Sequence, residues 1–107
     1  MKSKLQNRLE SGLSAITAEI MPPRGTNTAL ALSKAFKLKD VVHGFNVTDG
    51  SRAIMRMSSL ALCKLLLEAK LEPILQLSCR DRNRIALQAE LLGTHALGIR
   101  NILCLTG

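Results

Sequence analysis

The segment from Leu75 to Gly107 decides the fold, and it reads LQLSCRDRNRIALQAELLGTHALGIRNILCLTG. The apolar run at 73–77 predicts a strand, and a polar loop follows it. Apolar residues then recur at helical spacing, which predicts a helix whose C-cap is Gly98. The stripe residues of this helix are Ile85, Ala89, Leu92 and Ala96. A second strand is predicted over 101–105, so the whole segment predicts a βαβ unit.

The same alternation of strands and helices extends towards the N-terminus. A short leading helix is predicted over about 2–12, because leucines recur there at every fourth position. Strands are predicted over 15–21, where Pro22 ends the run, and over 41–47. Helical stripes follow both strands: Ala29, Leu32 and Phe36 after the first, and Ile54, Met57, Ala61 and Leu65 after the second.

The strands return after about 30 residues, the length of a βαβ unit, which predicts a parallel sheet. Two architectures fit this spacing: an open doubly wound sheet and part of a (β/α)8 barrel. Polar residues share one face of the predicted strands: Thr17 with Glu19, Asn46 with Thr48, Gln76 with Ser78, and Cys104 with Thr106. Such a face would be costly under a second layer of helices, whereas it can line the ligand site of a barrel.

The predicted fold class is therefore α/β, as a partial (β/α)8 TIM barrel of about four βα units ending at the fourth strand. A full barrel needs ~250 residues, so a chain of 107 residues corresponds to about half of one. We expect the N-terminal half of such a barrel over 1–107, preceded by the leading helix.

Composition argues against several classes of protein, among them nucleic-acid-binding, metal-binding and membrane proteins. The formal net charge is +7, yet the basic residues are spread along the chain and no Trp or Tyr is available to stack on bases. We therefore expect a basic surface and no nucleic-acid partner. Three cysteines lie far apart, which indicates a reducing compartment and predicts no metal site. No secretion signal or membrane span is predicted, so we expect a cytoplasmic protein.

Two acidic residues are candidates for chemistry. Glu19 lies near the end of an otherwise apolar strand, where burial would raise its pKa and keep a proton available. The alternative, a salt bridge to a neighbouring Lys or Arg, is equally weighted on residue chemistry alone. Asp49 could bind a ligand, although the N-cap of the following helix, which Ser51 could also provide, is the more common role.

The third strand and its loop supply further candidates. Gln76 and Ser78 would face the barrel interior, where they could bind the polar edge of a heteroaromatic cofactor or hydrogen-bond to each other. The loop after them is cationic, with arginines at positions 80, 82 and 84. It could contact phosphate, or it could be a solvated helix start that pairs with Asp81. Either Asp81 or Asn83 would cap that helix.

Four segments together resemble the methylenetetrahydrofolate reductase family. They are Glu19–Gly25 (EIMPPRG), Val47–Gly50 (VTDG), Cys79–Asn83 (CRDRN) and Gly98–Gly107 (GIRNILCLTG). The likeness runs in order from about Ala18 to Gly107 and corresponds to the N-terminal half of the family's catalytic barrel.

The resemblance implies a flavin-dependent reductase of one-carbon metabolism that converts 5,10-methylenetetrahydrofolate to 5-methyltetrahydrofolate. It implies FAD, with FMN as the alternative, and a reduced nicotinamide as electron donor. Glu19 matches the general acid that opens the folate ring to an iminium, which then accepts hydride from the flavin. Thr48 and Gln76 match positions beside the flavin. Leu105, Thr106 and Gly107 match the strand whose backbone runs along it.

Two departures from the family pattern stand out. Gln76 occupies a position that is histidine in many members, and the acidic residue that follows the Leu-x-Gly segment would come after Gly107. By itself the chain is expected to be inactive and free of flavin, with an oligomer or partner subunit closing the sheet edges. The alternatives are a non-catalytic half-barrel that assembles with itself or a partner, and a small doubly wound module that binds a ligand or nucleic acid.

Overall fold

Four strands alternate with helices in the computed structural model, which describes residues 2–107. The strands are β1 (Thr17–Ile20), β2 (Gly44–Val47), β3 (Pro73–Ser78) and β4 (Ile102–Leu105). The helices are α1 (Lys4–Glu10), α2 (Ala29–Leu38), α3 (Ser59–Glu68) and α4 (Arg84–Ala96), with a 3-10 turn, η1 (Ser51–Ala53), before α3. Each predicted element is present, and the ends of the strands differ from the prediction by at most a few residues.

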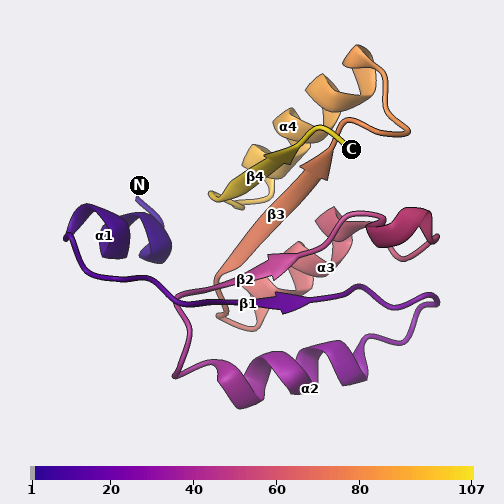
Figure 1. Ribbon diagram of the computed structural model, residues 1–107. Coiled ribbons are helices and arrows are strands. Elements are labelled where there is room, and N and C mark those ends of the chain that lie inside the picture. The colour runs from indigo at the N-terminus through magenta and orange to yellow at the C-terminus, as the bar shows by residue number, and fades with distance from the viewer. Residues whose placement is uncertain (1) are drawn as a thin grey trace.

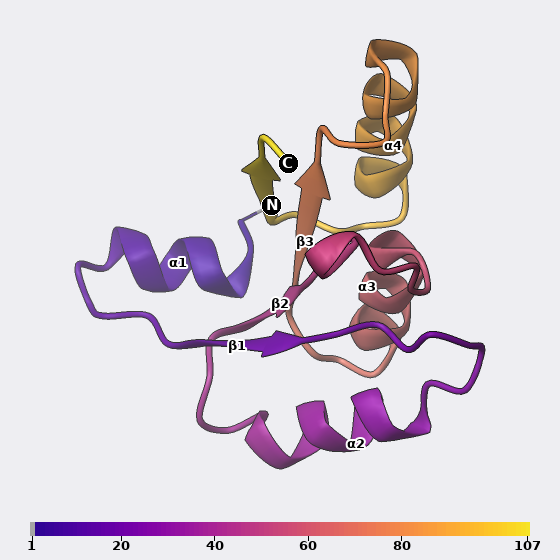
Figure 2. The same ribbon diagram turned by 45° about the vertical axis from the view of Figure 1, so that its right-hand side comes forward.

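The strands form one parallel sheet in the order β1-β2-β3-β4. A doubly wound sheet reverses its strand order at a switch point, and no reversal occurs here. Because crossovers of one hand in unbroken order return on the same side, the connecting helices all cover one face. Figure 2 shows α2, α3 and α4 along one side of the curled sheet and α1 on the other. The fold is α/β with the arrangement of a partial (β/α)8 barrel, as predicted.

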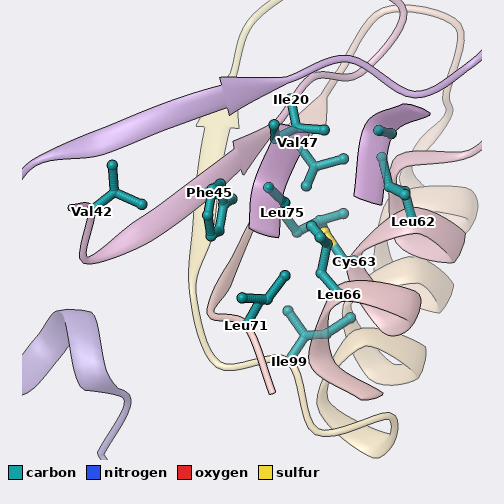
Figure 3. Packing of buried hydrophobic residues seen from close by; sticks show 12 residues of the cluster. Ile20, Val42, Phe45, Val47, Leu62, Cys63, Leu66, Leu71, Leu75 and Ile99 are labelled. Atoms are coloured by element: carbon teal, nitrogen blue, oxygen red, sulfur yellow. The ribbon is translucent and has the colours of Figure 1, made fainter. Parts of the chain in front are cut away.

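The core lies between the sheet and α3. Leu62 and Leu66 of α3 are fully buried against Val47 of β2 and Leu75 of β3, the central strands (Figure 3). Ile99, which follows α4, closes the same cluster. Burial of each large aliphatic side chain contributes about 1.5–3 kcal/mol, so this layer fixes the side of the sheet that the helices cover.

The inner face, the side of the sheet away from α2, α3 and α4, carries polar residues on three strands. In the register of the strands, Glu19 of β1 pairs with Asn46 of β2. Gln76 of β3 pairs with Leu103 of β4, and paired residues in a parallel sheet point to the same side. The prediction that Cys104 and Thr106 share the polar face is therefore wrong. The residues of β4 are all apolar or weakly polar. Its sequence therefore has no alternation of polar and apolar residues that could predict which side chains lie on the inner face.

The buried sides of the helices also differ from the predicted stripes. Helix α3 begins only at Ser59, so Ile54 and Met57 precede it, and Met55 between them is 70% exposed. In α4, Ile85 and Leu92 are 72% and 75% exposed. The buried residues of the helices are instead Leu62, Cys63 and Leu66 in α3, Thr94 in α4, and Ala31 and Ala35 in α2. These helices carry apolar residues on more than one side, so sequence periodicity cannot choose among them.

Helix α4 begins and ends as the sequence predicts. The Asn83 side chain accepts a hydrogen bond from the Ala86 N–H at 2.8 Å, which makes it the N-cap. Gly98 follows the C-cap with φ +93°, and the N–H of Ile99 reaches back to the Thr94 carbonyl at 3.1 Å. This is a Schellman motif, which requires the left-handed conformation at Gly98. The cap of α3 is Ser58, so the prediction that Asp49 or Ser51 caps it is wrong.

Helix α1 packs at the amino ends of the strands and lies within the predicted 2–12. The Glu72 carboxylate accepts hydrogen bonds from the Leu5 N–H at 2.7 Å and from the Asn101 side chain at 3.2 Å. Ser3, the N-cap of α1, donates to Asn101 at 2.6 Å. Because these contacts hold α1 at one end of the sheet, the carboxyl ends of the strands remain open (Figure 1).

Replacing Leu62 by Ala should lower the free energy of unfolding by about 2–5 kcal/mol, because it leaves a cavity in the core. Leu92→Ala is the matched control, since Leu92 is 75% exposed and its loss should change the stability by less than about 0.5 kcal/mol. Urea unfolding followed by circular dichroism measures both. Equal destabilisation by the two variants would contradict the assignment of the core.

Gly98→Ala should destabilise the protein by about 1–2 kcal/mol, because φ is +93° there and an added Cβ would lie 3.3 Å from Leu67 Cδ2. Gly93→Ala is its counterpart within α4, where an added Cβ meets nothing within 4 Å. That change should stabilise the helix by up to about 1 kcal/mol. Thermal unfolding of both variants should show shifts of opposite sign.

Candidate functional site

The carboxyl ends of β2 and β3 are joined by an ion pair. Asp49, two residues after the end of β2, accepts a hydrogen bond from the Ser78 N–H at 2.8 Å and binds both terminal nitrogens of Arg82. The hydrogen bond that Arg82 donates to Asp49 raises the pKa of Arg82 above its ordinary value, and partial burial opposes this only in part. The Asp49 carboxylate is therefore already bound to groups of the protein itself. Sequence reasoning missed this pairing, although its signal was present as opposite charges after adjacent strands.

The cationic loop also makes contacts within the protein. Arg80 donates to the Gly50 carbonyl at 2.6 Å and to Asp81 at 3.0 Å, and Arg84 is exposed. An added Cβ at Gly107 would lie 2.7 Å from Arg80 Cβ and 2.9 Å from its backbone nitrogen. The absence of a side chain at Gly107 thus lets the end of β4 pass close to Arg80.

Glu19 lies on the inner face beside Asn46, whose amide donates to Thr17 Oγ1 at 2.9 Å. Its side chain is exposed, so the expected burial around this carboxylate is not found. The alternative fails as well, because the ion pairs among residues 2–107 do not include Glu19. The carboxylate is therefore open to the space in front of the sheet.

Thr48 and Gln76 present polar groups without partners. Thr48 is 5% exposed, and its hydroxyl has no hydrogen-bond partner within residues 2–107. Gln76 is half-buried, and the hydrogen bonds found for it involve only its backbone. The predicted bond between Gln76 and Ser78 is not formed, because Ser78 Oγ accepts instead from the Arg80 N–H at 3.1 Å. Buried polar groups normally find partners, so the Thr48 hydroxyl marks a position suited to a ligand.

A hollow of about 790 Å³ lies elsewhere on the inner face, between α1 and the amino ends of the strands. Its walls include Leu5 and Leu9 of α1 with Ile74 and Leu103 of the sheet. This end of the sheet is more apolar than the end that carries Glu19 and Thr48. Barrel enzymes place their active sites at the other end, above the carboxyl ends of the strands.

No cluster of three or more His, Cys, Asp or Glu residues suited to a metal ion occurs among residues 2–107. Within the same range, no helix has the length and apolar character needed to cross a membrane.

Comparison with known families identifies the family of the chain. The profile of the family described as methylenetetrahydrofolate reductase matches residues 4–107. The chain belongs to the methylenetetrahydrofolate reductase family. This membership implies a folate-related reductase role within an oxidoreductase family whose fold is a TIM barrel. No curated protein matches the chain at the significance required.

The residues that the methylenetetrahydrofolate reductase resemblance singled out fall into two groups. Glu19, Thr48, Gln76 and Leu105 come from four adjacent strands or their ends, and the register places Leu105 beside Ser78. Thr106 and Gly107 follow β4 and are exposed, with Gly107 against Arg80. The fold thus gathers the first group along one edge, whereas the second forms part of the contact between β4 and the loop after β3.

Alkylation should separate the three thiols. Burial raises the pKa of the Cys63 thiol from 9.0 to about 12, whereas Cys79 and Cys104 are exposed. Because the thiolate is the reactive form, iodoacetamide at pH 8 should modify Cys79 and Cys104 and leave Cys63 unmodified until the protein unfolds. Mass spectrometry of the native and the urea-unfolded protein measures this. Modification of Cys63 at the same rate as the other two would contradict its place in the core.

Proposed function

We propose that this chain forms half of a flavin-dependent (β/α)8 barrel that reduces 5,10-methylenetetrahydrofolate to 5-methyltetrahydrofolate. Family membership and the unreversed order of parallel strands support the proposal. A closed barrel of this kind has eight strands, so four more would complete it. The observation that carries most weight is the unpartnered Thr48 hydroxyl, on the same edge of the sheet as the open Glu19 carboxylate.

The residues at this edge fit a flavin. The ring edge of a flavin alternates donors and acceptors, and the Thr48 hydroxyl and Gln76 amide can each supply either. An unsatisfied buried hydroxyl costs about 1–3 kcal/mol, which a bound ring would recover. The backbone of β4 at Leu105 lies beside β3 and could run along the ring. We propose FAD as the cofactor, with FMN as the alternative, and a reduced nicotinamide as the electron donor.

When bound, the flavin would supply the hydride. Glu19 would hold the proton that the folate nitrogen needs as its ring opens, since no cation among residues 2–107 pairs with this carboxylate. Closure of the barrel would remove water from around Glu19. The free thiols agree with a reducing compartment, and we propose that the protein acts in the cytoplasm.

A non-catalytic half-barrel that assembles with a second copy is the other candidate. It is favoured by one observation: among residues 2–107, β1 pairs only with β2 and β4 only with β3. Unpaired strand edges invite association. A stable dimer in size-exclusion chromatography of the purified chain, together with a stop codon after codon 107, would support this candidate.

Sequencing the encoding gene past codon 107 is the first test of the reductase proposal. We expect an acidic residue directly after Gly107, followed by four more βα units. A stop codon there would contradict the idea of one continuous barrel, and the search would turn to a separately encoded second half.

In the complete barrel, Glu19→Gln should lower the rate of methylenetetrahydrofolate reduction by roughly 10²–10⁴-fold, the usual contribution of a general acid. Reduction of the flavin by nicotinamide should be unchanged, because that step needs no proton from Glu19. Stopped-flow absorbance separates the two half-reactions. Glu68→Gln, on the exposed side of α3, is the control and should leave both rates unchanged. Equal rates for Glu19→Gln and the control would refute the assigned role.

A further inference from the structure

The ion pair between Asp49 and Arg82 differs from the others in its burial. The Asp49 and Arg82 side chains are 12% and 21% exposed, whereas those of the other ion pairs within residues 2–107 are at least 37% exposed. Arg82 holds the carboxylate through both terminal nitrogens, a two-pronged geometry that fixes orientation as well as distance. A pair of this kind fixes the groups next to it more firmly than a surface pair does.

The pair also forms hydrogen bonds with both backbone groups of Ser78, its N–H and its carbonyl. Asp49 Oδ2 accepts from the Ser78 N–H at 2.8 Å, and Arg82 Nη1 donates to the Ser78 carbonyl at 2.9 Å. The ladder between β2 and β3 runs only from Phe45 opposite Pro73 to Val47 opposite Leu75. Beyond that point β3 has no partner strand on the β2 side, and the Asp49 carboxylate continues the connection in its place.

Two of the proposed flavin contacts are adjacent to this connection. Thr48 is the residue before Asp49, and Gln76 lies two positions before Ser78, with its side chain on the inner face as Ser78 is. Without the pair, the end of β2 would be tied to β3 only below this level. The Thr48 N–H would still donate to the Ile20 carbonyl of β1 at 3.2 Å, and Gln76 would still pair with Leu103 of β4. The separation of the Thr48 hydroxyl and the Gln76 amide would then depend on these outer strands, with no direct connection between β2 and β3 at this level.

We propose that Asp49 and Arg82 are positioning residues that hold Thr48 and Gln76 at the spacing needed to bind one edge of the flavin. This inference rests on the proposed function for its ligand, but the ordering of the strand ends can be measured without any flavin. Neither residue touches the ligand in this account. The pair acts through the backbone of Ser78 and the end of β2.

Three variants test it. Asp49→Asn keeps an acceptor for the Ser78 N–H but removes the charge that holds Arg82. Arg82→Lys keeps the charge but removes the two-pronged geometry. Asp81→Asn is the control: it breaks the exposed pair with Arg80 in the same loop, and Asn is well suited to the left-handed conformation of that residue, φ +64°.

Amide hydrogen exchange of the chain, followed by NMR, provides the readout without flavin. In Asp49→Asn and Arg82→Lys, we expect exchange at Thr48 and Ser78 to accelerate at least about tenfold, equivalent to about 1.4 kcal/mol. Exchange at Phe45 and Leu75, lower in the same strands, should match wild type, as should every amide in the control. Unchanged exchange at Thr48 and Ser78 would overturn the inference, and so would uniform acceleration throughout the sheet.

Flavin binding supplies the second readout, in the complete barrel with FAD as the probe. Both variants should raise the Kd for FAD at least about tenfold and shift the absorption bands of the bound flavin, while Asp81→Asn changes neither. Local exchange changes together with unaltered FAD affinity and spectrum would overturn the positioning role. If wild type binds neither FAD nor FMN, the proposed function fails, and the exchange data alone decide whether the pair orders the strand ends.

Discussion

Three consecutive parallel pairings without a reversal constrain everything else in this structure. Because each crossover returns on the same side, α2, α3 and α4 cover one face of the sheet and leave the other open. Leu62 and Leu66 of α3 make this choice stable by filling the layer against the two central strands. An inner face with polar residues on three strands, opposite an apolar face that the helices cover, is the expected result for part of a barrel.

The two ends of the sheet are stabilised by different contacts. At the amino ends, Glu72 and Asn101 tie down α1 with neutral and charged hydrogen bonds. At the carboxyl ends, Asp49 and Arg82 join the loops after β2 and β3. This division matches the family, in which barrel chemistry takes place above the carboxyl ends while the opposite end contributes stability. The unpartnered Thr48 hydroxyl lies at the carboxyl end.

The candidate site could be located from sequence only in outline. Polar residues at strand ends were recognised, but the partner of Asp49 was not, because Arg82 lies 33 positions away and only strand pairing brings the two together. The same limit explains β4, where four apolar or weakly polar residues leave the inward side undefined. Glu19 illustrates a third limit of sequence-based prediction. Burial of its carboxylate depends on the groups that pack against the inner face, and these cannot be inferred from the strand that carries Glu19.

The sequence by itself determined the order of elements, the end of α4 at Gly98, and the family, because these depend on local spacing and on short motifs. Only the tertiary structure decided which side of each helix is buried. Leu92 and Thr94 lie two positions apart in α4, yet the larger apolar residue is exposed and the smaller polar one is buried. Burial follows from packing in three dimensions and not from apolar spacing, and Thr94 remains satisfied in its buried position by donating its hydroxyl to the Glu90 carbonyl at 2.6 Å.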